Sequence, residues 1–306
     1  MRAAKQHMSE VAVAAVNSGD LRRVLPLLRV FEKNTPGLGD RQWRRMFDYR
    51  WASDSLVRGY ALVAGAEWVG FRGCIQHQRV LRGELHRIVS TTSWVVRPEY
   101  RKQTTSPGGG RLSDLLLDAV DDWHRRETMT SVAMSVRPEL TDRFKARGYE
   151  VLETETAMWP TLGRPRWDGW RVEHRPDRVR DRLNETQARL FDDHRSLPCL
   201  QLVVTRGKEK CYLVLCLRRS GRVSRLARIV HLSDAGVFES ALGALGWFLL
   251  TRYRVRWLEW DMRWLRGRLP AGALRRRLAS PRMFKSAVLE PAEIDNLYSE
   301  IVLLEL

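Results

Sequence analysis

The stretch Ile88-Val-Ser-Thr-Thr-Ser-Trp-Val-Val96 begins the part of the sequence that decides the fold. It is rich in β-branched residues, which favour strands, and Pro98 ends it because proline has no N–H to give to a sheet. The loop Glu99–Gly110 follows and is rich in charged residues and glycine. After it, Leu112–Trp123 has apolar residues at helical spacing and acidic residues on the other face, which predicts an amphipathic helix.

A strand, a glycine-rich loop and a helix N-terminus in this order form a setting for phosphate groups. The first N–H groups of a helix have no partner within the helix, and the helix dipole is positive at that end. Glycine lets the backbone approach a phosphate closely. Three glycines before a helix are, however, also typical of a plain surface loop, so this pattern needs further support.

Alternating strands and helices are predicted on both sides of this stretch. Before it we expect helices at 20–31 and 40–49 and strands at 59–65 and 67–75. After it we expect a strand at 130–136, a helix at 138–147 that Gly148 ends, and a strand at 149–158. This order predicts an α/β (α+β) fold with a mixed sheet and crossover helices.

The composition changes at Trp159–Arg171, where Pro, Gly, Arg and Trp predominate. We therefore predict a domain at 1–158, a linker at 159–171 and a second domain at 172–306. The second half should contain a helix at 181–193, strands at 199–205, 210–218, 224–232 and 255–261, and a helix at 237–253 between the last two. This element order repeats the end of the first half, although the residues do not repeat.

Two segments of the second half have a further reading. Ala241–Leu250 is apolar on all sides and predicts a helix buried on several sides, where Gly243 and Gly246 allow close approach to a sheet. We also predict that the two halves fold against each other as one unit. The segments 282–285 and 297–304 are expected to form a last strand or helix.

Composition excludes several classes of protein. The 306 residues are 44% hydrophobic and 29% charged, as in ordinary globular chains, and the four cysteines contain no CxxC pair. No metal-ligand spacing is visible, so no metal is expected. The longest apolar stretch, Val237–Tyr253, falls short of the ~20 residues that cross a bilayer, and the first residues do not resemble a secretory signal. We expect a cytoplasmic protein with reduced thiols and no membrane span.

The net charge of +17 permits anionic partners such as nucleic acid. However, 46 of the 53 basic residues are arginine, a skew that is typical of GC-rich codon usage. The densest runs, such as Arg275–Arg277, are short and dispersed. A solvated surface therefore explains the charge more simply than a nucleic-acid partner does.

The segment Trp94-Val-Val-Arg-Pro-Glu-Tyr-Arg-Lys102 resembles the strand-to-loop signature of the Gcn5-related N-acetyltransferase (GNAT) superfamily. The segment Ser135–Tyr149 is similar to the second motif of that family, and it follows at the right spacing. The resemblance covers residues 20–158 and implies a GNAT-type acyltransferase. The second half looks like a further, degenerate GNAT-type domain on its element order.

This resemblance implies acyl-coenzyme A as the donor, with acetyl-coenzyme A expected, and an amine or less often a hydroxyl of a small molecule or sugar as the acceptor. By analogy the backbone of Val95 and Val96 would hold the pantetheine arm as an added strand. The residues that would surround the pyrophosphate are Arg101, Lys102, Gln103, Gly108, Gly109, Gly110, Arg111 and Leu112.

Two departures from the family pattern stand out. The loop is longer than the compact turn of the family, because Thr104–Pro107 interrupts it. The tyrosine that commonly protonates the leaving thiolate aligns with Phe144, which cannot donate a proton. Catalysis then requires another acid, or solvent.

The chemistry requires a base that deprotonates the acceptor and donors that stabilise an oxyanion. Candidate catalytic residues are His86, immediately before the central strand, and Glu84, with His77, on the preceding hairpin. His194, beside Asp192 and Asp193, is a further candidate because a carboxylate can orient an imidazole. Each of these also reads as a surface or helix-end polar residue.

Twelve tryptophans allow either core packing or ligand stacking. They include Trp257, Trp260 and Trp264 on and after a predicted strand, and Trp159, Trp167 and Trp170 in the linker. Two alternatives to an acyl-coenzyme A enzyme stay open: a Fem-type aminoacyl-tRNA-dependent transferase and a non-catalytic GNAT-like binding module.

Overall fold

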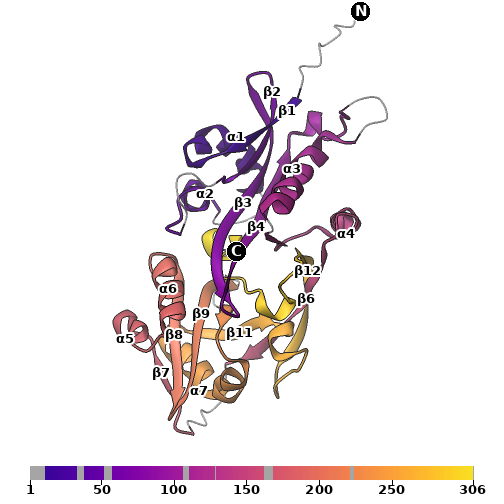
Figure 1. Ribbon diagram of the computed structural model, residues 1–306. Helices are drawn as coiled ribbons and strands as arrows, with labels where there is room; N and C mark the ends of the chain where they lie inside the picture. The colour runs from indigo at the N-terminus through magenta and orange to yellow at the C-terminus, as the bar shows by residue number, and fades with distance from the viewer. Residues whose placement is uncertain are drawn as a thin grey trace, which may run out of the picture. The chain divides into compact units, whose positions relative to one another are not determined.

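A computed structural model describes residues 11–32, 38–51, 57–105, 110–127, 129–161, 168–220 and 224–305 of the chain. The chain forms two compact units. The first comprises Met1–Gln78 and His86–Ser131, and the second comprises Arg79–Leu85 and Val132–Leu306. The fold is mixed α/β, as predicted, and both units are built around β-sheet (Figure 1).

The first unit has the strand order β1-β2-β3-β4-β5. Its strands are β1 (Val11–Val16), β2 (Gly59–Ala64), β3 (Glu67–Leu81), β4 (Glu84–Val96) and β5 (Thr130–Ala133), of which the tip of the β3–β4 hairpin and the end of β5 belong to the second unit. Its helices are α1 (Leu21–Glu32), α2 (Asp40–Phe47) and α3 (Leu112–Glu127). β1 and β2 pair antiparallel, with Val11 opposite Ala64. This unit therefore contains the strand–loop–helix stretch singled out in the sequence.

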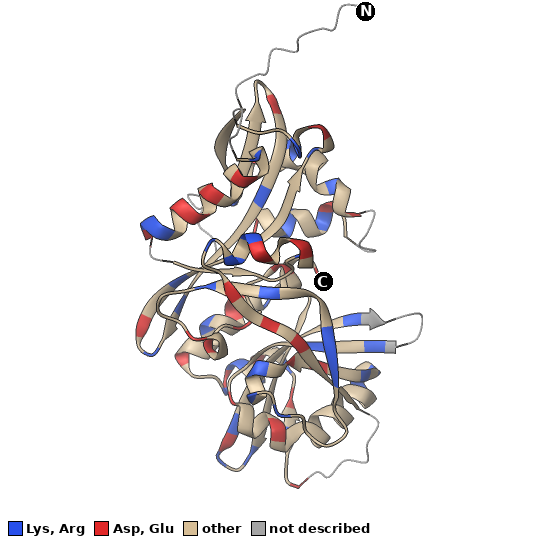
Figure 2. Cartoon of the chain, turned by 90° about the vertical axis from the view of Figure 1, so that its right-hand side faces the viewer, with Lys and Arg blue, Asp and Glu red and all other residues tan. Residues whose placement is uncertain are grey.

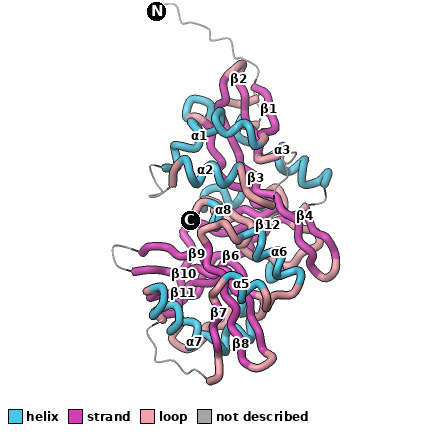
Figure 3. Tube along the Cα trace, turned by 90° about the vertical axis from the view of Figure 1, so that its left-hand side faces the viewer, coloured by secondary structure: helices cyan, strands magenta, loops and turns pink. Residues whose placement is uncertain are grey.

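The second unit has the strand order β12-β6-β11-β10-β9-β8-β7 (Figure 3). Its strands are β6 (Glu150–Pro160), β7 (Arg171–Glu173), β8 (Cys199–Arg206), β9 (Glu209–Ser220), β10 (Ser224–Leu232), β11 (Val255–Asp261) and β12 (Leu274–Lys285). Its helices are α4 (Thr141–Lys145), α5 (Pro176–Arg180), α6 (Glu185–His194), α7 (Ala235–Tyr253) and α8 (Glu300–Leu303). β10 and β11 are parallel because α7 crosses over between them, whereas β6 pairs antiparallel with both β11 and β12.

Helix α7 packs on the sheet of the second unit, as its apolar sequence predicts. Its buried side chains join those of β8, β9, β10 and β11 in one core, with Phe238 and Leu245 fully buried. Gly246 lies against the ring of Trp159, and a Cβ at this position would come within 2.4 Å of that ring. The predicted close approach of this helix to the sheet is therefore confirmed at Gly246.

The structure corrects several predicted elements. The helix expected at 181–193 begins later, as α6, because Asn184 caps it by accepting a hydrogen bond from the backbone N–H of Gln187 at 2.9 Å; the separate short helix α5 precedes it. The strands β6 and β7 extend into the two ends of the expected linker, at Pro160 and Arg171, while residues 162–167 lie outside the described part of the chain. Strand β1 is unpredicted, and β12 is longer than the segment 282–285 indicated.

Along the chain, the boundary between the two units falls within β5, ahead of the composition change at Trp159–Arg171. The division into domains at 1–158 and 172–306 stays a prediction about which pieces fold alone.

Candidate functional site

Strand β4 is distorted two residues before Val95. Ser93 has φ of 52°, in the left-handed region that residues other than glycine rarely adopt. Such a residue within a strand marks a bulge, which bends the strand and turns the following backbone groups. Val95 and Val96 are buried, and the Val96 side chain packs with Leu112 and Leu116 of α3. The end of β4 is thus fixed on the helix that follows the loop.

Backbone contacts shape the loop after β4. The backbone N–H of Arg97 donates to the carbonyl of Val69 on β3 at 2.8 Å. The Arg101 side chain donates through Nε to the carbonyl of Val96 at 2.7 Å, and Gln103 Nε2 donates to the carbonyl of Glu99 at 3.0 Å. Arg101 and Gln103 therefore organise the loop itself, while the remaining N–H groups of the exposed Arg101 and the side chain of the exposed Lys102 can meet a ligand.

The inserted residues of the loop close on themselves. Thr104 and Arg111 form an isolated β-bridge, and the backbone N–H of Thr105 donates to the carbonyl of Gly110 at 3.0 Å. Gly108 and Gly109 lie outside the described residues. Thr104 and Thr105 are thus held beside Gly110 and Arg111, at the N-terminus of α3.

The N-terminus of α3 differs from the anion cradle that the sequence predicts. The backbone N–H of Leu112 donates to the carbonyl of Gln103 at 3.0 Å, and the Leu112 side chain is buried in the core. Asp114 adds a negative charge in the first turn. Arg111 and Gly110 are exposed. A pyrophosphate here would meet the arginine and lysine side chains of the loop but fewer free helix N–H groups than expected.

A polar cluster on the central strands was not predicted. Arg72 of β3 is buried, donates from NH2 to Thr91 Oγ1 at 3.0 Å, and has its guanidinium carbon 5.5 Å from the ring centroid of Trp94. The hydroxyl of Ser90 is buried and has no hydrogen-bond partner among the described residues. The run Ser90–Ser93 in a strong strand was the sequence signal for this cluster, because small hydroxyl residues are unusual in a fully buried strand.

Two of the proposed catalytic residues lie far along β4 from Val95. His86 precedes Val95 by nine residues, which corresponds to about 30 Å of extended strand. Glu84 is two residues further away and is exposed beside the hairpin turn. His77 is half-buried on β3. The strand therefore does not bring Glu84 or His86 to the end of β4 that carries the loop.

His194 is fully buried at the end of α6. Its Nδ1 lies 2.9 Å from the carbonyl oxygen of Leu190 and its Nε2 lies 3.0 Å from that of Leu297. Burial lowers its pKa to about 4. An imidazole held between two carbonyls, with no exposed surface, ties α6 to the C-terminal segment and has no access to a substrate.

The neighbours of His194 have separate partners. Asp192 accepts hydrogen bonds from Nε and NH2 of Arg180 at 3.0 and 2.8 Å, and Asp193 accepts one from the hydroxyl of Tyr298 at 2.6 Å. Neither carboxylate orients the imidazole, as the sequence suggested it would. Phe144 is buried and packs edge-on against Tyr149, with ring centroids 5.1 Å apart.

The second unit lacks a glycine-rich loop at the corresponding place. Only Ser233 and Asp234 connect β10 with α7, and the Asp234 carboxylate caps the helix by accepting from the backbone N–H of Val237 at 2.9 Å. A carboxylate already occupies the helix N-terminus, so this turn is not a phosphate site. Trp170 and Trp260 are core residues of this unit, and Trp167 lies outside the described residues.

In the described ranges, no group of three or more His, Cys, Asp or Glu side chains could hold a metal ion. No helix in the described part of the chain is long and apolar enough to cross a membrane.

Comparison with known proteins rests on structure alone. No protein-family model and no curated protein sequence matches the chain. A GCN5-related N-acetyltransferase from Anabaena variabilis has a TM-score of 0.59 and 12% identity, over 90% of this chain and 72% of that one. A GCN5-related N-acetyltransferase from Kribbella flavida has a TM-score of 0.57 and 15% identity, over 90% and 71%.

A putative acetyltransferase from Pyrococcus horikoshii matches over 97% of this chain and 96% of its own, with a TM-score of 0.52 and 12% identity. These matches extend over both units, although the recognisable sequence motifs lie within residues 94–149. The chain therefore has the fold of the GCN5-related N-acetyltransferases.

Proposed function

We propose that the protein is an acyl-coenzyme A-dependent acyltransferase that acts on an amine, or less often a hydroxyl, of a small molecule or sugar. The observation that carries the proposal is the left-handed backbone at Ser93, which interrupts the regular strand just before Val95 and the loop bearing Arg101 and Lys102. This arrangement occurs in a chain with the fold of GCN5-related N-acetyltransferases.

The donor would bind along the end of β4. A pantetheine arm carries amide groups, so it can lie beside a strand and exchange hydrogen bonds with the backbone of Val95 and Val96. The carbonyl of Val96 already accepts from Arg101, which places the arginine beside the same segment. The adenosine phosphates would then meet Arg101, Lys102 and Arg111.

The reaction is a direct transfer. The acceptor amine attacks the thioester carbonyl, the carbon–sulfur bond breaks, and the amine loses a proton while the thiolate gains one. Phe144 cannot supply that proton, so we propose that solvent protonates the thiolate. We also propose that solvent removes the amine proton, because Glu84 and His86 do not lie at the loop end of β4 and His194 is fully buried. Backbone N–H groups beyond the Ser93 bulge would stabilise the oxyanion.

The helix N-terminus modifies this proposal. Because the N–H of Leu112 is already bonded and Asp114 is acidic, the phosphates should contribute less to affinity than in a site with a free helix end. We therefore expect acyl-pantetheine to be accepted as a donor, with a smaller loss relative to acyl-coenzyme A than a full phosphate cradle would give.

Calorimetry with coenzyme A, acetyl-coenzyme A and longer acyl-coenzymes A tests the proposed function, together with release of free thiol in the presence of an amine library. Binding of a thioester donor and thiol release that depends on the amine support the proposal. Absence of binding by every donor refutes it.

A non-catalytic binding module is the second candidate. The apolar Phe144 and the closed insertion between Thr104 and Arg111 favour it. Donor affinity without thiol release on any amine would support this candidate over the enzyme.

The third candidate, a tRNA-dependent transferase, rests on the charge of +17. Basic and acidic residues are interspersed along the helices and strands in Figure 2. Binding of tRNA whose affinity falls steeply with salt would favour this candidate.

A further inference from the structure

Three arginines gather on one face of the sheet in the second unit. In register, Arg228 of β10 lies opposite Glu259 of β11, and Leu226 of β10 lies opposite Arg218 of β9. Because side chains alternate along a strand, Arg218, Arg228 and Glu259 share a face. Arg276 of β12 joins them, since its NH1 lies 3.6 Å from Glu259 Oε1. We call Arg218, Arg228 and Arg276 the arginine cluster.

The opposite face of these strands is the apolar one. Ala227, Leu258 and Trp260, each adjacent in sequence to a residue of the polar face, are buried in the core with α7. The arginine cluster is therefore a separate feature of the sheet, on the face away from that helix.

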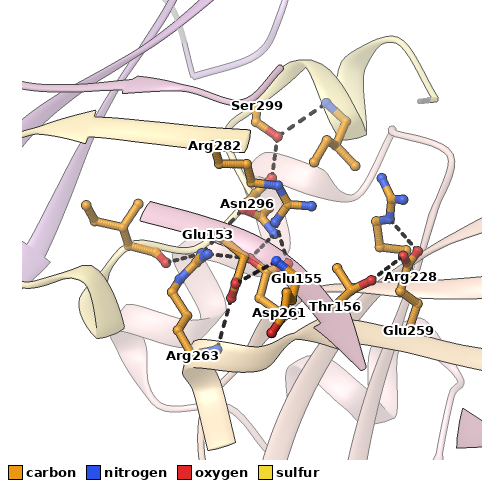
Figure 4. Close-up of polar contacts among 12 residues, drawn as sticks. Glu153, Glu155, Thr156, Arg228, Glu259, Asp261, Arg263, Arg282, Asn296 and Ser299 are labelled. Atoms are coloured by element: carbon orange, nitrogen blue, oxygen red, sulfur yellow. Dashed lines mark hydrogen bonds and ion pairs between the residues drawn. The ribbon is translucent and has the colours of Figure 1, made fainter. Parts of the chain in front are cut away.

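Glu259 is the centre of the cluster and is fully buried (Figure 4). Arg228 Nε donates to its Oε2 at 2.8 Å, and the Thr156 hydroxyl donates to its Oε1 at 2.9 Å. Burial acts to raise the pKa of Glu259, but the charge and hydrogen bond of Arg228 outweigh it and keep the pKa below its usual value. Glu259 is thus an ionised carboxylate whose two oxygens are both engaged.

Arg218 is the arginine of the cluster that does not contact Glu259. It is half-buried, and it has no hydrogen bond or ion pair with any described residue. Burial and the neighbouring charges of Arg228 and Arg276 lower its pKa, and the charge of Glu259 offsets them only in part. The sequence that follows it, residues 219–224, contains no acidic residue.

The charge balance around the cluster is positive. The nearby acids are Glu259 and Glu305, whose charge acts on Cys216 opposite Arg228. Three guanidinium groups thus stand against two carboxylates. Desolvating an arginine without a partner is costly, so an unpaired, half-buried guanidinium in a positive environment is a ready binding partner for an anion.

An aromatic surface adjoins the cluster. Trp257 of β11 precedes Glu259 by two residues, so it shares the face, and it lies opposite Leu226, the residue that pairs with Arg218. Trp257 is half-buried. Neighbouring strands are about 4.8 Å apart, which puts Arg218 and Trp257 about 10 Å from each other across β10.

We propose that the arginine cluster binds the oxyanion of an aromatic carboxylate or phosphate whose ring lies against Trp257. Arginine suits this chemistry because its planar fork matches two oxygens of a carboxylate or phosphate. The approximate span from Arg218 to Trp257 accommodates a ring one or two bonds from its anionic group. This site is independent of the proposed acyl transfer.

The test uses the full chain and four probes: phenyl phosphate, phenylacetate, inorganic phosphate and the neutral benzyl alcohol. Binding is followed by calorimetry and by quenching of tryptophan fluorescence. We expect the two aromatic anions to bind, inorganic phosphate to bind more weakly, and benzyl alcohol not to bind. Whichever aromatic anion binds more tightly identifies the anionic group.

Arg218→Gln should weaken binding of the aromatic anions at least about tenfold, because charge-assisted hydrogen bonds contribute most to such sites. The matched control is Arg252→Gln, which removes an exposed arginine of α7, the helix that packs on the opposite face of the sheet. This control should leave affinity unchanged. Thermal melts establish that both variants are folded.

Three results would overturn the proposal. One is the absence of binding by both aromatic anions, and another is equal affinity of the R218Q variant and the parent protein. The third is an equal loss in R252Q and R218Q, which would indicate only a general attraction of anions to a basic protein.

Discussion

The replacement of Asp261 by asparagine should destabilise the second unit strongly. Asp261 ends β11 and is fully buried; two groups donate hydrogen bonds to its carboxylate and a third forms an ion pair with it (Figure 4). Arg282 NH1 donates to Oδ1, Asn296 Nδ2 donates to Oδ2 at 3.0 Å, and Arg263 NH1 lies 2.5 Å from Oδ2. The carboxylate is therefore the counter-charge of two buried guanidinium groups.

The magnitude follows from these contacts. Asparagine keeps one acceptor oxygen but carries no charge, so at least one buried arginine loses its partner. Removing one member of a buried ion pair costs about 3–5 kcal/mol. Two hydrogen bonds to charged groups, at ~1.5–3 kcal/mol each, give a similar sum. Because domains are stable by only ~5–15 kcal/mol, this loss is a large fraction of the total.

Urea denaturation, followed by tryptophan fluorescence, measures the effect, because Trp260 is fully buried in the same strand. With a urea dependence of about 2 kcal/mol per molar, a loss of 4 kcal/mol lowers the midpoint by about 2 M. The matched control is Asp192→Asn, which makes the same chemical change in an ion pair whose Arg180 and Asp192 side chains are 49% and 43% exposed. Water screens that pair, so its loss should be a small part of the Asp261 effect.

A second variant separates charge from packing. Arg282→Met combined with Asp261→Asn removes one of the stranded cations and should recover part of the lost stability, because replacing buried ionic groups by apolar ones is often tolerated. Equal midpoints for D261N and D192N would refute the reasoning. So would a double variant that is less stable than D261N by the full cost of the single Arg282→Met change.

Three further predictions concern the candidate site and the buried histidine. Replacing Arg101 and Lys102 together by alanine should raise the dissociation constant for acyl-coenzyme A about tenfold or more, measured by calorimetry; unchanged affinity would remove the loop from the site. The Glu84→Ala and His86→Ala variants should retain the parent rate of thiol release, since both residues lie about 30 Å or more of strand away from Val95, and a large drop in kcat would show that one of them acts in catalysis. Burial lowers the pKa of His194 to about 4, so the unfolded chain binds more protons than the folded one between that value and the usual ~6.5, and stability falls as the pH falls through this range. The His194→Gln variant should therefore show a smaller difference in unfolding free energy between pH 4.5 and pH 7. An unchanged difference would contradict this explanation.

Local sequence patterns were sufficient for the elements that carry their own signal. β4 is marked by β-branched residues and a following proline, and α7 by a long apolar run with Asp234 as its cap. β1, with the sequence Val-Ala-Val-Ala-Ala-Val, is too short and too uniformly apolar to indicate a strand by itself, and its state depends on pairing with β2. β12 is rich in arginine and contains Pro281, so only its pairing along β6 identifies it.

The candidate site divides in the same way. Arg101 and Lys102 were predicted because they follow a strand end within one continuous segment. The contact of Arg72 with Thr91 joins two strands, so it depends on their register, which a single sequence does not reveal. The surroundings of His194 differ from those that the sequence suggested. The sequence shows an adjacent carboxylate, but the ring is held by the carbonyls of Leu190 and Leu297, and Leu297 is more than a hundred residues away in the chain.

The two units illustrate how one topology serves different chemistry. In the first, the connection from β4 to α3 is long, carries Arg101 and Lys102, and leaves Arg111 exposed at its end. In the second, the equivalent connection from β10 to α7 is two residues long and ends in the capping carboxylate of Asp234. A donor with phosphates would be repelled there, so this turn cannot serve as a donor site, although the strand–helix–strand packing is kept.

The polar face of the sheet in the second unit contains buried ion pairs around Glu259 and Asp261, and these ion pairs hold its strands together. Arg218 lies beside this network and has no hydrogen bond or ion pair with a described residue. It is therefore the residue to which we assign the binding of an anionic ligand.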